Sequence, residues 1–403
     1  MRTTFAAVRV CHSLSVRVAL IVGAGIGGLA AGIALRRAGW DVRIFERADA
    51  PRELGFGVGI APNALSALRE LGVADAVLPH MVFPSAGEAR RIDGRVLRRF
   101  GGDPAAMRAL NTPGLIMRPA LHGALLAPIQ DAVRAGSEAV HFESVGRGVR
   151  LRFANGEEET GDLLIGADGI HSTVRAQLHP GEPPPRRSGY LALRGASSAL
   201  ECLEGLTAIW YFGRAVESAI VQAGPRSIYW FVSLLAAEER GLPLDPRSVL
   251  ERWAPRFDDQ FRTVTGATPP DLLRVDELLE RDPLTTWGAG PVTLLGDAAH
   301  PMLPFTGQGA AQALEDAAGL GRALRGAKEP IPAVRRYEQV RGARTTPIVV
   351  SGPRIGRMTT TKNPLAALVR NAALRSVPAA LIVRLLSRPA PDPNLPLGAP
   401  LSA

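Results

Sequence analysis

The feature that most constrains the fold lies near the start of the chain, where an apolar run leads directly into a glycine-rich motif. Residues 16–22 (VRVALIV) have the composition of a buried strand, and the motif GAGIGG occupies residues 23–28. Apolar residues then recur at helical spacing up to Gly39, and residues 41–45 (DVRIF) form a second strand-like run. A strand, a glycine loop, a helix and a strand in this order predict a dinucleotide-binding βαβ unit.

Three glycines of this motif and the acid after the second strand each have a physical role in binding a dinucleotide. Gly23 permits the tight turn, Gly25 lets a pyrophosphate approach the backbone, and Gly28 allows close packing of the helix on the strand. Glu46 follows the second strand at the distance where an acid binds the ribose hydroxyls of adenosine. The motif alone is weak evidence, but its placement between two strands with this acid makes it strong.

A second stretch, residues 292–318, combines a strand, an acid and a glycine loop. Residues 292–295 are apolar, Asp297 follows them, and helical spacing resumes at about Ala310. The carboxylate of Asp297 can accept hydrogen bonds from a polyol. The free N–H groups of the first helical turn after Gly309 can face negative charge. We interpret the stretch as the site of the ribityl chain and flavin ring of FAD.

Three further segments are candidates for the cofactor site. Asp168 stands beside glycines at the end of the strand predicted at 162–165, where it can orient backbone and a ribose. Arg118 precedes a predicted helix and either contacts a phosphate or ribose or is simply exposed. Residues 54–60 (LGFGVGI) are too rich in glycine for an ordinary strand, so they either pass close to a flat ligand or form a flexible loop.

The middle of the chain has a different residue pattern. Residues 189–235 alternate polar and apolar positions and are rich in aromatic residues, which predicts antiparallel strands with one face exposed. Such a sheet would form a roof for an aromatic substrate, or its aromatic residues would only be core. Residues 248–252, 270–280 and 331–344 favour helices. Residues 363–388 are amphipathic, with these expected buried positions: Leu365, Leu368, Ala372, Leu374 and Leu381.

Composition restricts the class of protein. A chain of 403 residues with 46% hydrophobic residues is too long for one simple core, so two interleaved lobes are expected. The net charge of +9 comes from scattered arginine, which does not favour nucleic-acid binding. Two cysteines show no disulfide or metal-ligand spacing, so we expect a cytoplasmic protein without a metal, and no apolar run reaches membrane-spanning length. We expect residues 1–15 to be a disordered leader.

Three motifs in order carry a resemblance to a known family. GAGIGG is followed by Glu46-Arg47, GADGIHSTVR occupies 166–175, and GDAAHPMLPFTGQGAAQALEDA occupies 296–317. Together they resemble the FAD-dependent aromatic hydroxylases, the single-component flavoprotein monooxygenases similar to salicylate and para-hydroxybenzoate hydroxylases. The resemblance extends from residue 16 to about residue 344.

The resemblance implies a role for each matching position. The first motif, with Ala24, would hold the adenosine diphosphate, and Asp168 would lie near the pyrophosphate. Glu46 would bind ribose and Asp297 the ribityl chain. The other implied cofactor contacts are Arg47, Gly59, Arg118, Val145, Pro304, Gly307, Gln308, Gly309, Ala310 and Ala311. Ala311 departs from the Asn often found in that loop of the family.

The family chemistry implies FAD as cofactor and NAD(P)H as a transient co-substrate. Dioxygen would form a flavin hydroperoxide that hydroxylates an aromatic or heteroaromatic ring. Tyr211 and Arg194 are the candidate catalytic residues, Gln222 is a candidate substrate contact, and His300 either faces the site or stabilises its loop. Glu217 replaces an arginine of a urate-oxidising relative, which argues against a urate-like anionic substrate.

These observations predict an α/β fold with a Rossmann-type FAD-binding domain, an interleaved mixed or antiparallel β-sheet substrate domain and C-terminal helices. The expected FAD-binding domain comprises 16–75, 112–185 and 280–345, the substrate domain 76–111 and 186–279, and the C-terminal helices and loose tail 346–403. We expect a monomer or homodimer without stable membrane association. Two other functions stay open: epoxidation or tailoring of a polyketide or terpenoid, and a non-catalytic FAD-binding redox sensor.

Overall fold

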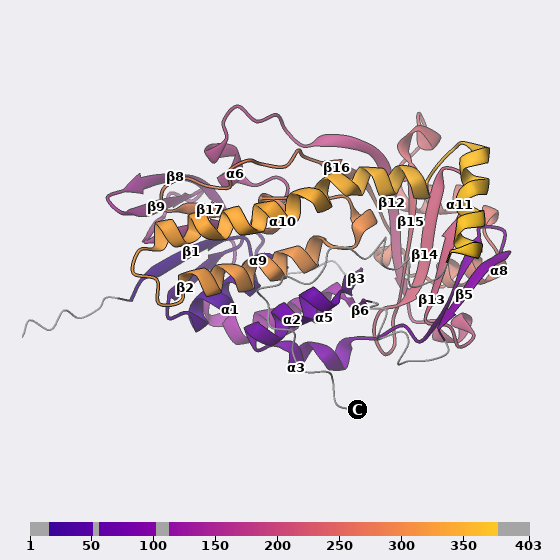
Figure 1. Ribbon diagram of the computed structural model, residues 1–403, viewed down its shortest axis with the longest axis horizontal. Helices are drawn as coiled ribbons and strands as arrows, with labels where there is room; N and C mark the ends of the chain where they lie inside the picture. The colour runs from indigo at the N-terminus through magenta and orange to yellow at the C-terminus, as the bar shows by residue number, and fades with distance from the viewer. Residues whose placement is uncertain (1–15, 51–55, 102–112, 378–403) are drawn as a thin grey trace, which may run out of the picture.

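The predicted βαβ unit forms the centre of a parallel sheet in the computed structural model, which describes residues 16–50, 56–101 and 113–377 (Figure 1). Strand β1 is the middle strand, and every neighbouring pair in the sheet is parallel. Such a sheet is buried on both faces, which explains its apolar strands. In spatial order the strands are β17 (Val292–Leu294), β11 (Leu163–Gly166), β1 (Val18–Val22), β2 (Asp41–Phe45) and β7 (Val133–Arg134).

Helices cover this sheet and bury its apolar side chains. Helix α1 (Ile26–Arg37) packs against α9 (Gly309–Leu324), so the first and last motifs are neighbours in space (Figure 1). Helix α9 is in turn contacted by α2 (Pro62–Leu71) and α10 (Pro330–Thr359). Among the described residues, this part also contains helices α3 (Ala74–Val77), α5 (Arg118–Leu126) and α6 (Thr173–Leu178).

Two small antiparallel sheets flank the parallel one. One contains β8 (Ala139–Val145), β9 (Gly148–Phe153) and β10 (Glu158–Gly161). The other pairs β3 (Gly57–Ile60) with β6 (Gly114–Met117), so the glycine-rich segment is a strand and not a flexible loop where it is described. A Cβ atom on Gly57 would lie 2.6 Å from the ring of Tyr229, which explains a glycine at that point.

A seven-stranded sheet forms the second layer of the molecule, as the aromatic-rich segment predicts. All neighbouring strands are antiparallel except β13 and β4, which are parallel. In spatial order the strands are β16 (Arg274–Glu280), β12 (Arg186–Ser197), β15 (Ile228–Leu235), β14 (Val216–Gln222), β13 (Ala208–Phe212), β4 (Ala86–Arg91) and β5 (Val96–Gly101).

One face of this sheet packs on two helices and forms a separate core. Helix α7 (Pro246–Trp253) confirms the helix predicted at 248–252, and α8 (Asp259–Gly266) lies beside it in the same core. The helix predicted at 270–280 is wrong, because most of that segment is the edge strand β16, paired with β12. The strands of the parallel sheet lie in the segments assigned to the FAD-binding domain, and those of the seven-stranded sheet lie almost entirely in the segments assigned to the substrate domain. We keep this division into two domains as a proposal.

The C-terminal region is a long helix followed by a short one. Helix α10 continues well beyond the predicted 331–344 and spans the molecule from the parallel sheet to the seven-stranded sheet, where α11 (Pro364–Ser376) lies beside β5 (Figure 1).

The expected buried face of α11 is wrong, because Leu365 and Leu368 are exposed and Ala367 and Arg370 are buried instead. Ala372 is also exposed and Leu374 is half-buried. The expected leader 1–15, Leu381 and the tail lie outside the described residues. Within the described residues, no helix combines the length and apolarity that a membrane crossing requires.

Candidate active site

One large cavity, of about 1440 Å³, connects the motifs that the sequence analysis identified. Its wall begins at Gly23 and Gly25, passes Glu46 and Asp168, and continues to Asp297. From there it opens onto the seven-stranded sheet. Segments almost 300 residues apart in the sequence thus share one cavity, because α1 and α9 are packed side by side.

The glycine motif forms a tight turn at one end of the cavity. Gly23 has φ +102°, and a Cβ there would lie 2.5 Å from the carbonyl oxygen of Ala167. A Cβ on Gly28 would lie 1.9 Å from the carbonyl oxygen of Gly23, as expected for close packing of helix on strand. The Ala24 backbone N–H donates to Oε2 of Glu46 at 2.9 Å, so the acid is held at the end of β2.

Asp168 and Arg118 lie in the middle of the cavity wall. Oδ1 of Asp168 accepts a hydrogen bond from the Ser172 hydroxyl at 2.5 Å, and Oδ2 accepts one from the Thr173 backbone N–H at 2.8 Å. Asp168 therefore holds the start of α6, while burial raises the pKa of its carboxyl. Arg118 is the first residue of α5, and its backbone N–H donates to the carbonyl of Phe56 at 2.8 Å.

The other end of the cavity is formed by the turn after β17 and the start of α9. Asp297 faces the cavity and accepts no hydrogen bond from another described residue. Asp297 is exposed to the cavity, but the protein atoms around the cavity partly desolvate its carboxyl, and this raises its pKa. Pro304, Gly307, Gln308, Gly309 and Ala310 line the adjacent wall. The free N–H groups of the first turn of α9 therefore border the cavity.

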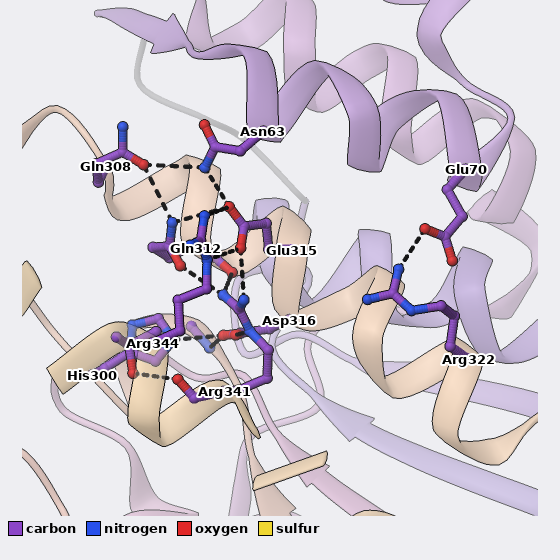
Figure 2. Close-up of polar contacts among 12 residues, drawn as sticks. Asn63, Glu70, His300, Gln308, Gln312, Glu315, Asp316, Arg322, Arg341 and Arg344 are labelled. Atoms are coloured by element: carbon purple, nitrogen blue, oxygen red, sulfur yellow. Dashed lines mark hydrogen bonds and ion pairs between the residues drawn. The ribbon is translucent and has the colours of Figure 1, made fainter. Parts of the chain in front are cut away.

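A buried polar network supports this end from behind (Figure 2). Oε1 of Gln308 accepts from Nδ2 of Asn63 and from Nε2 of Gln312, both at 3.2 Å. Asn63 and Gln312 also donate to Oε1 of Glu315. The network thereby links α2 to the first turns of α9 at the point where α9 borders the cavity.

Two arginines of α10 complete the network (Figure 2). Arg341 donates to Oε2 of Glu315 and to Oδ1 of Asp316, each at 2.6 Å, and Arg344 donates to Glu315 at 2.5 Å. Oδ2 of Asp316 accepts from the Gly296 backbone N–H at 3.0 Å and contacts Nε2 of His300 at 2.5 Å. His300 therefore stabilises the loop, which is one of the two roles that its sequence context allows.

One face of the seven-stranded sheet closes the cavity. Residues directly opposite each other in an antiparallel ladder point to the same face, and alternate residues along a strand do the same. Trp210 is opposite Ala219, which is opposite Phe231, and Phe212 is opposite Glu217. The aromatic face, as we call it, consists of Trp210, Phe212, Tyr229 and Phe231, all of which line the cavity.

Tyr211 does not belong to this face, so its predicted catalytic role is corrected. It stands between Trp210 and Phe212 on β13 and therefore points to the opposite side of the sheet. Its side chain is fully buried among Phe257 and Phe261. Its hydroxyl donates to Oδ1 of Asp258 at 3.0 Å. Burial and the neighbouring Asp258 raise the pKa of Tyr211, which disfavours a phenolate base.

Arg194 does line the cavity, in the row of Phe231 and Trp210. Its guanidinium is ion-paired with Asp276 of β16 and lies 5.1 Å from the ring centroid of Phe56. Gln222 does not line the cavity.

Only some of the residues that the family resemblance implies as cofactor contacts line the cavity. Arg47 and Gly59 line the cavity. Ala24 and Gly28 lie directly behind its glycine end and Ala311 is fully buried in α9, so these three support the wall. Val145 is corrected: it ends β8 with 42% of its surface exposed and does not line the cavity. Instead the cavity is lined by residues 137–139, just before and at the start of that strand.

Three polar residues of the cavity wall were not predicted from the sequence as site residues. They are Arg98 of β5, Arg370 of α11 and Glu217 of β14, of which only Glu217 is noted in the sequence, as a departure from a relative. Arg98 and Arg370 belong to no sequence motif. They reach the site only because α11 packs beside β5.

The cavity fits an extended dinucleotide such as FAD. A turn without side chains at Gly23 and Gly25 suits a pyrophosphate, and Glu46 suits a ribose. Asp297 offers free acceptor oxygens to a polyol, and the start of α9 offers N–H donors to an electron-rich ring. Fold and site together define an FAD-binding oxidoreductase whose second sheet closes the cavity.

Comparisons with known proteins agree with this class. The model of a family described as FAD binding domain matches residues 15–329. The aurachin C monooxygenase/isomerase of Stigmatella aurantiaca is 35% identical over 364 residues, which cover 88% of this chain and 93% of that protein. The 6-hydroxynicotinate 3-monooxygenase of Pseudomonas fluorescens is 32% identical, covering 83% of this chain and 90% of that protein.

A solved structure extends the likeness to three dimensions. HpxO of Klebsiella pneumoniae, crystallised with FAD and uric acid, has a TM-score of 0.85 at 26% identity and covers 92% of this chain and 96% of that one. The chain therefore belongs to the FAD-dependent aromatic hydroxylase family of flavoprotein monooxygenases. As a member it is an oxidoreductase with FAD as cofactor and NAD(P)H and dioxygen as co-substrates.

Proposed function

We propose that this monooxygenase hydroxylates a small aromatic or heteroaromatic molecule held between the flavin ring and the aromatic face. The observation that carries the proposal is the continuity of the cavity from the glycine motif to that face. FAD would occupy the part between Gly23 and Gly309. The part bounded by the aromatic face, which we call the substrate chamber, would then remain for a flat apolar ring.

We assign the cofactor contacts along this path. Gly23, Ala24, Gly25 and Gly28 form the pyrophosphate turn, and Glu46, Arg47, Arg118 and Asp168 surround the adenosine and phosphate part. Asp297 holds the ribityl hydroxyls. Gly59, Pro304, Gly307, Gln308, Gly309, Ala310 and Ala311 form the surroundings of the flavin ring.

Bound FAD supplies the redox chemistry, because it is reduced by NAD(P)H and reacts with dioxygen. The protein positions the cofactor and excludes water. The start of α9 places N–H donors beside the ring and favours negative charge there. The aromatic face and Phe305 provide an apolar surrounding for the substrate ring.

The relatives support an aromatic substrate. One acts on 6-hydroxynicotinate, and the solved structure contains uric acid, so both molecules are small rings. The relatives are monooxygenases, which does not favour a redox sensor. Several act on hydroxynicotinate, aminohydroxybenzoate or urate, which does not favour epoxidation or tailoring of a polyketide or terpenoid.

The test uses purified FAD-loaded protein with NADH and with NADPH. We expect at least one compound from a panel of phenols, hydroxypyridines and fused heteroaromatic rings to accelerate NAD(P)H oxidation. The product should contain one atom of ¹⁸O from ¹⁸O₂, measured by mass spectrometry. Oxidation that yields only hydrogen peroxide with every compound would contradict the proposal.

We also propose that the protein acts in the cytoplasm as a monomer or homodimer. The reduced co-substrate NAD(P)H and the single described cysteine, Cys202, which is free, support this setting. Sedimentation velocity of the FAD-loaded protein tests the oligomeric state, and a larger assembly would contradict it.

A further inference from the structure

Glu217 is a buried carboxyl in the wall of the substrate chamber. It lies on β14, opposite Phe212 on one side and Ser233 on the other. The side chain therefore shares the aromatic face, and Glu217 lines the cavity although only 8% of its surface is exposed. A carboxyl at this depth is unusual unless it has partners.

The hydrogen bonding of Glu217 is incomplete. Its Oε2 atom has no hydrogen-bond partner among the described residues. The nearby guanidinium of Arg370 donates instead to the carbonyl oxygens of Thr359 at 2.5 Å and Gly213 at 3.0 Å. Arg370 also lies 5.3 Å from the ring centroid of Phe212. Arg370 thus supplies positive charge near Glu217, but its three guanidinium nitrogens donate to these two carbonyls and to the Asn371 side chain.

The other cations of the chamber also have partners, although the Nε atoms of Arg98 and Arg194 have none among the described residues. Arg194 is ion-paired with Asp276, and Arg98 donates to the carbonyl oxygens of Leu374 and Val377. The Oε2 atom of Glu217 has no such partner. An unpaired buried acceptor is costly, so it is expected to receive a donor from the molecule that fills the chamber.

We propose that Glu217 determines substrate specificity by accepting a hydrogen bond from an N–H or O–H group at the edge of an uncharged aromatic ring. The inference rests on the proposed function, because it assumes that the ring occupies the substrate chamber. The inference defines the substrate class further. The substrate ring would present a hydrogen-bond donor, and not a carboxylate, to Glu217 on β14. Burial raises the pKa of Glu217 to about 7, opposed by the Thr359 hydroxyl and the charge of Arg370.

The position of Glu217 fits this role. It is placed where α10 meets the sheet, near Thr359. One turn earlier in α10, Gly356 packs against the ring of Phe305, which follows Pro304 in the loop beside the flavin site. Phe305 in turn contacts Tyr190 of β12, with ring centroids 4.8 Å apart. A ring bonded to Glu217 would therefore remain close to the flavin loop.

The test compares matched pairs of probes in FAD-loaded protein. 2-Quinolone carries a ring N–H and N-methyl-2-quinolone does not; 2-naphthol carries an O–H and 2-methoxynaphthalene does not. Dissociation constants are measured from the change in flavin absorbance, and 2-naphthoate serves as the anionic probe. In the wild type we expect the donor of at least one pair to bind about tenfold or more tightly than its methylated partner, and 2-naphthoate to bind weakly.

Variants assign the preference to Glu217. Glu217→Leu should abolish it, and Glu217→Gln, which keeps a neutral acceptor, should retain part of it. Glu239→Gln is the control, because Glu239 is a similarly buried carboxylate in the turn after β15 that contacts Arg252 and Trp253 and does not line the cavity. It should keep the full preference. FAD content and thermal unfolding verify that each variant folds.

The outcomes separate this inference from the proposed function. Equal binding within both pairs, tight binding of 2-naphthoate, a preference that survives in Glu217→Leu, or no binding by any probe overturns the role of Glu217. If an aromatic compound is still hydroxylated, the proposed function stands alone. A donor preference that Glu217→Leu abolishes supports the inference, even if no compound in the panel is hydroxylated.

Discussion

Nε of Arg341 lies 2.6 Å from Oδ1 of Asp316, while the other oxygen of the same carboxylate accepts the backbone N–H of Gly296 at 3.0 Å. One buried carboxylate thus joins helix α10 to the turn that contains Asp297, and Figure 2 shows the contact between Asp316 and Arg341. Both partners of the ion pair are at most 1% exposed. We infer that α10 positions the cofactor loop although Arg341 itself does not line the cavity.

Arg341→Met should destabilise the protein by about 3–5 kcal/mol, because it leaves the buried carboxylates of Glu315 and Asp316 without their central cation. Urea unfolding of the wild type and variant measures this change. Arg247→Met is the control, since the Arg247–Glu251 pair is exposed and should change stability by no more than about 0.5 kcal/mol. Equal effects of the two substitutions would refute the positioning role of Arg341.

Stability should fall in acid because of Asp316. Burial opposes its ionisation, but its interactions with His300 and Arg341 outweigh burial and lower its pKa from 3.8 to about 2. A carboxylate with a lowered native pKa contributes stability above its unfolded pKa and loses it as pH falls toward the native value. The contribution of about 2 kcal/mol should therefore disappear between about pH 4 and pH 2.

Thermal unfolding across that range tests the effect in the wild type and in Asp316→Asn. The variant should be less stable at neutral pH and should show a shallower decline below pH 4. The same decline in both proteins would assign the acid sensitivity to other carboxylates.

Asp297→Ala should weaken FAD binding by about tenfold or more, because the ribityl chain loses its charged hydrogen-bond acceptor. The measurement is FAD occupancy after gel filtration and titration of the apoprotein. Asp271→Ala changes an exposed acid outside the cavity and should leave binding intact. Full FAD occupancy in Asp297→Ala would count against the assigned site.

Two glycine-to-alanine substitutions in helices should have opposite effects. Gly28→Ala places a Cβ 1.9 Å from the carbonyl oxygen of Gly23, so we expect impaired folding and FAD loss. Gly123 of α5 is exposed and has nothing within 4 Å of such a Cβ. Gly123→Ala should therefore stabilise the protein by about 0.5–1 kcal/mol. Both variants are compared with the wild type by chemical unfolding and FAD content. A Gly28→Ala variant with unchanged stability and FAD content would disprove the close packing.

Tyr211→Phe tests the corrected role of that residue. Loss of the hydrogen bond to Asp258 should cost about 1–2 kcal/mol without changing kcat, because the hydroxyl faces away from the cavity. Trp210→Ala, one position earlier on the aromatic face, should weaken substrate binding instead. Steady-state kinetics and urea unfolding separate the two effects. A large loss of kcat in Tyr211→Phe would restore its catalytic assignment.

Local patterns were sufficient for the nucleotide-binding part of the molecule. The glycine motif, the acid after β2 and the strand–acid–glycine stretch have fixed spacings that reflect backbone geometry, and the structure places Gly23, Glu46 and Asp297 on one cavity. Local patterns were insufficient at 270–280, where leucine and glutamate favour a helix. Pairing with β12 across the sheet outweighs that weak propensity.

The sequence by itself determined the fold class and the cofactor, because the motifs that carry them depend on contacts between neighbours along the chain. Only the tertiary structure decided the substrate chamber. Strand register turned Tyr211 into the core and Glu217 toward the cavity, and a one-residue shift would reverse both. The packing of α10 and α11 then brought Arg341 behind the cofactor loop and Arg370 beside Glu217, which no local pattern encodes.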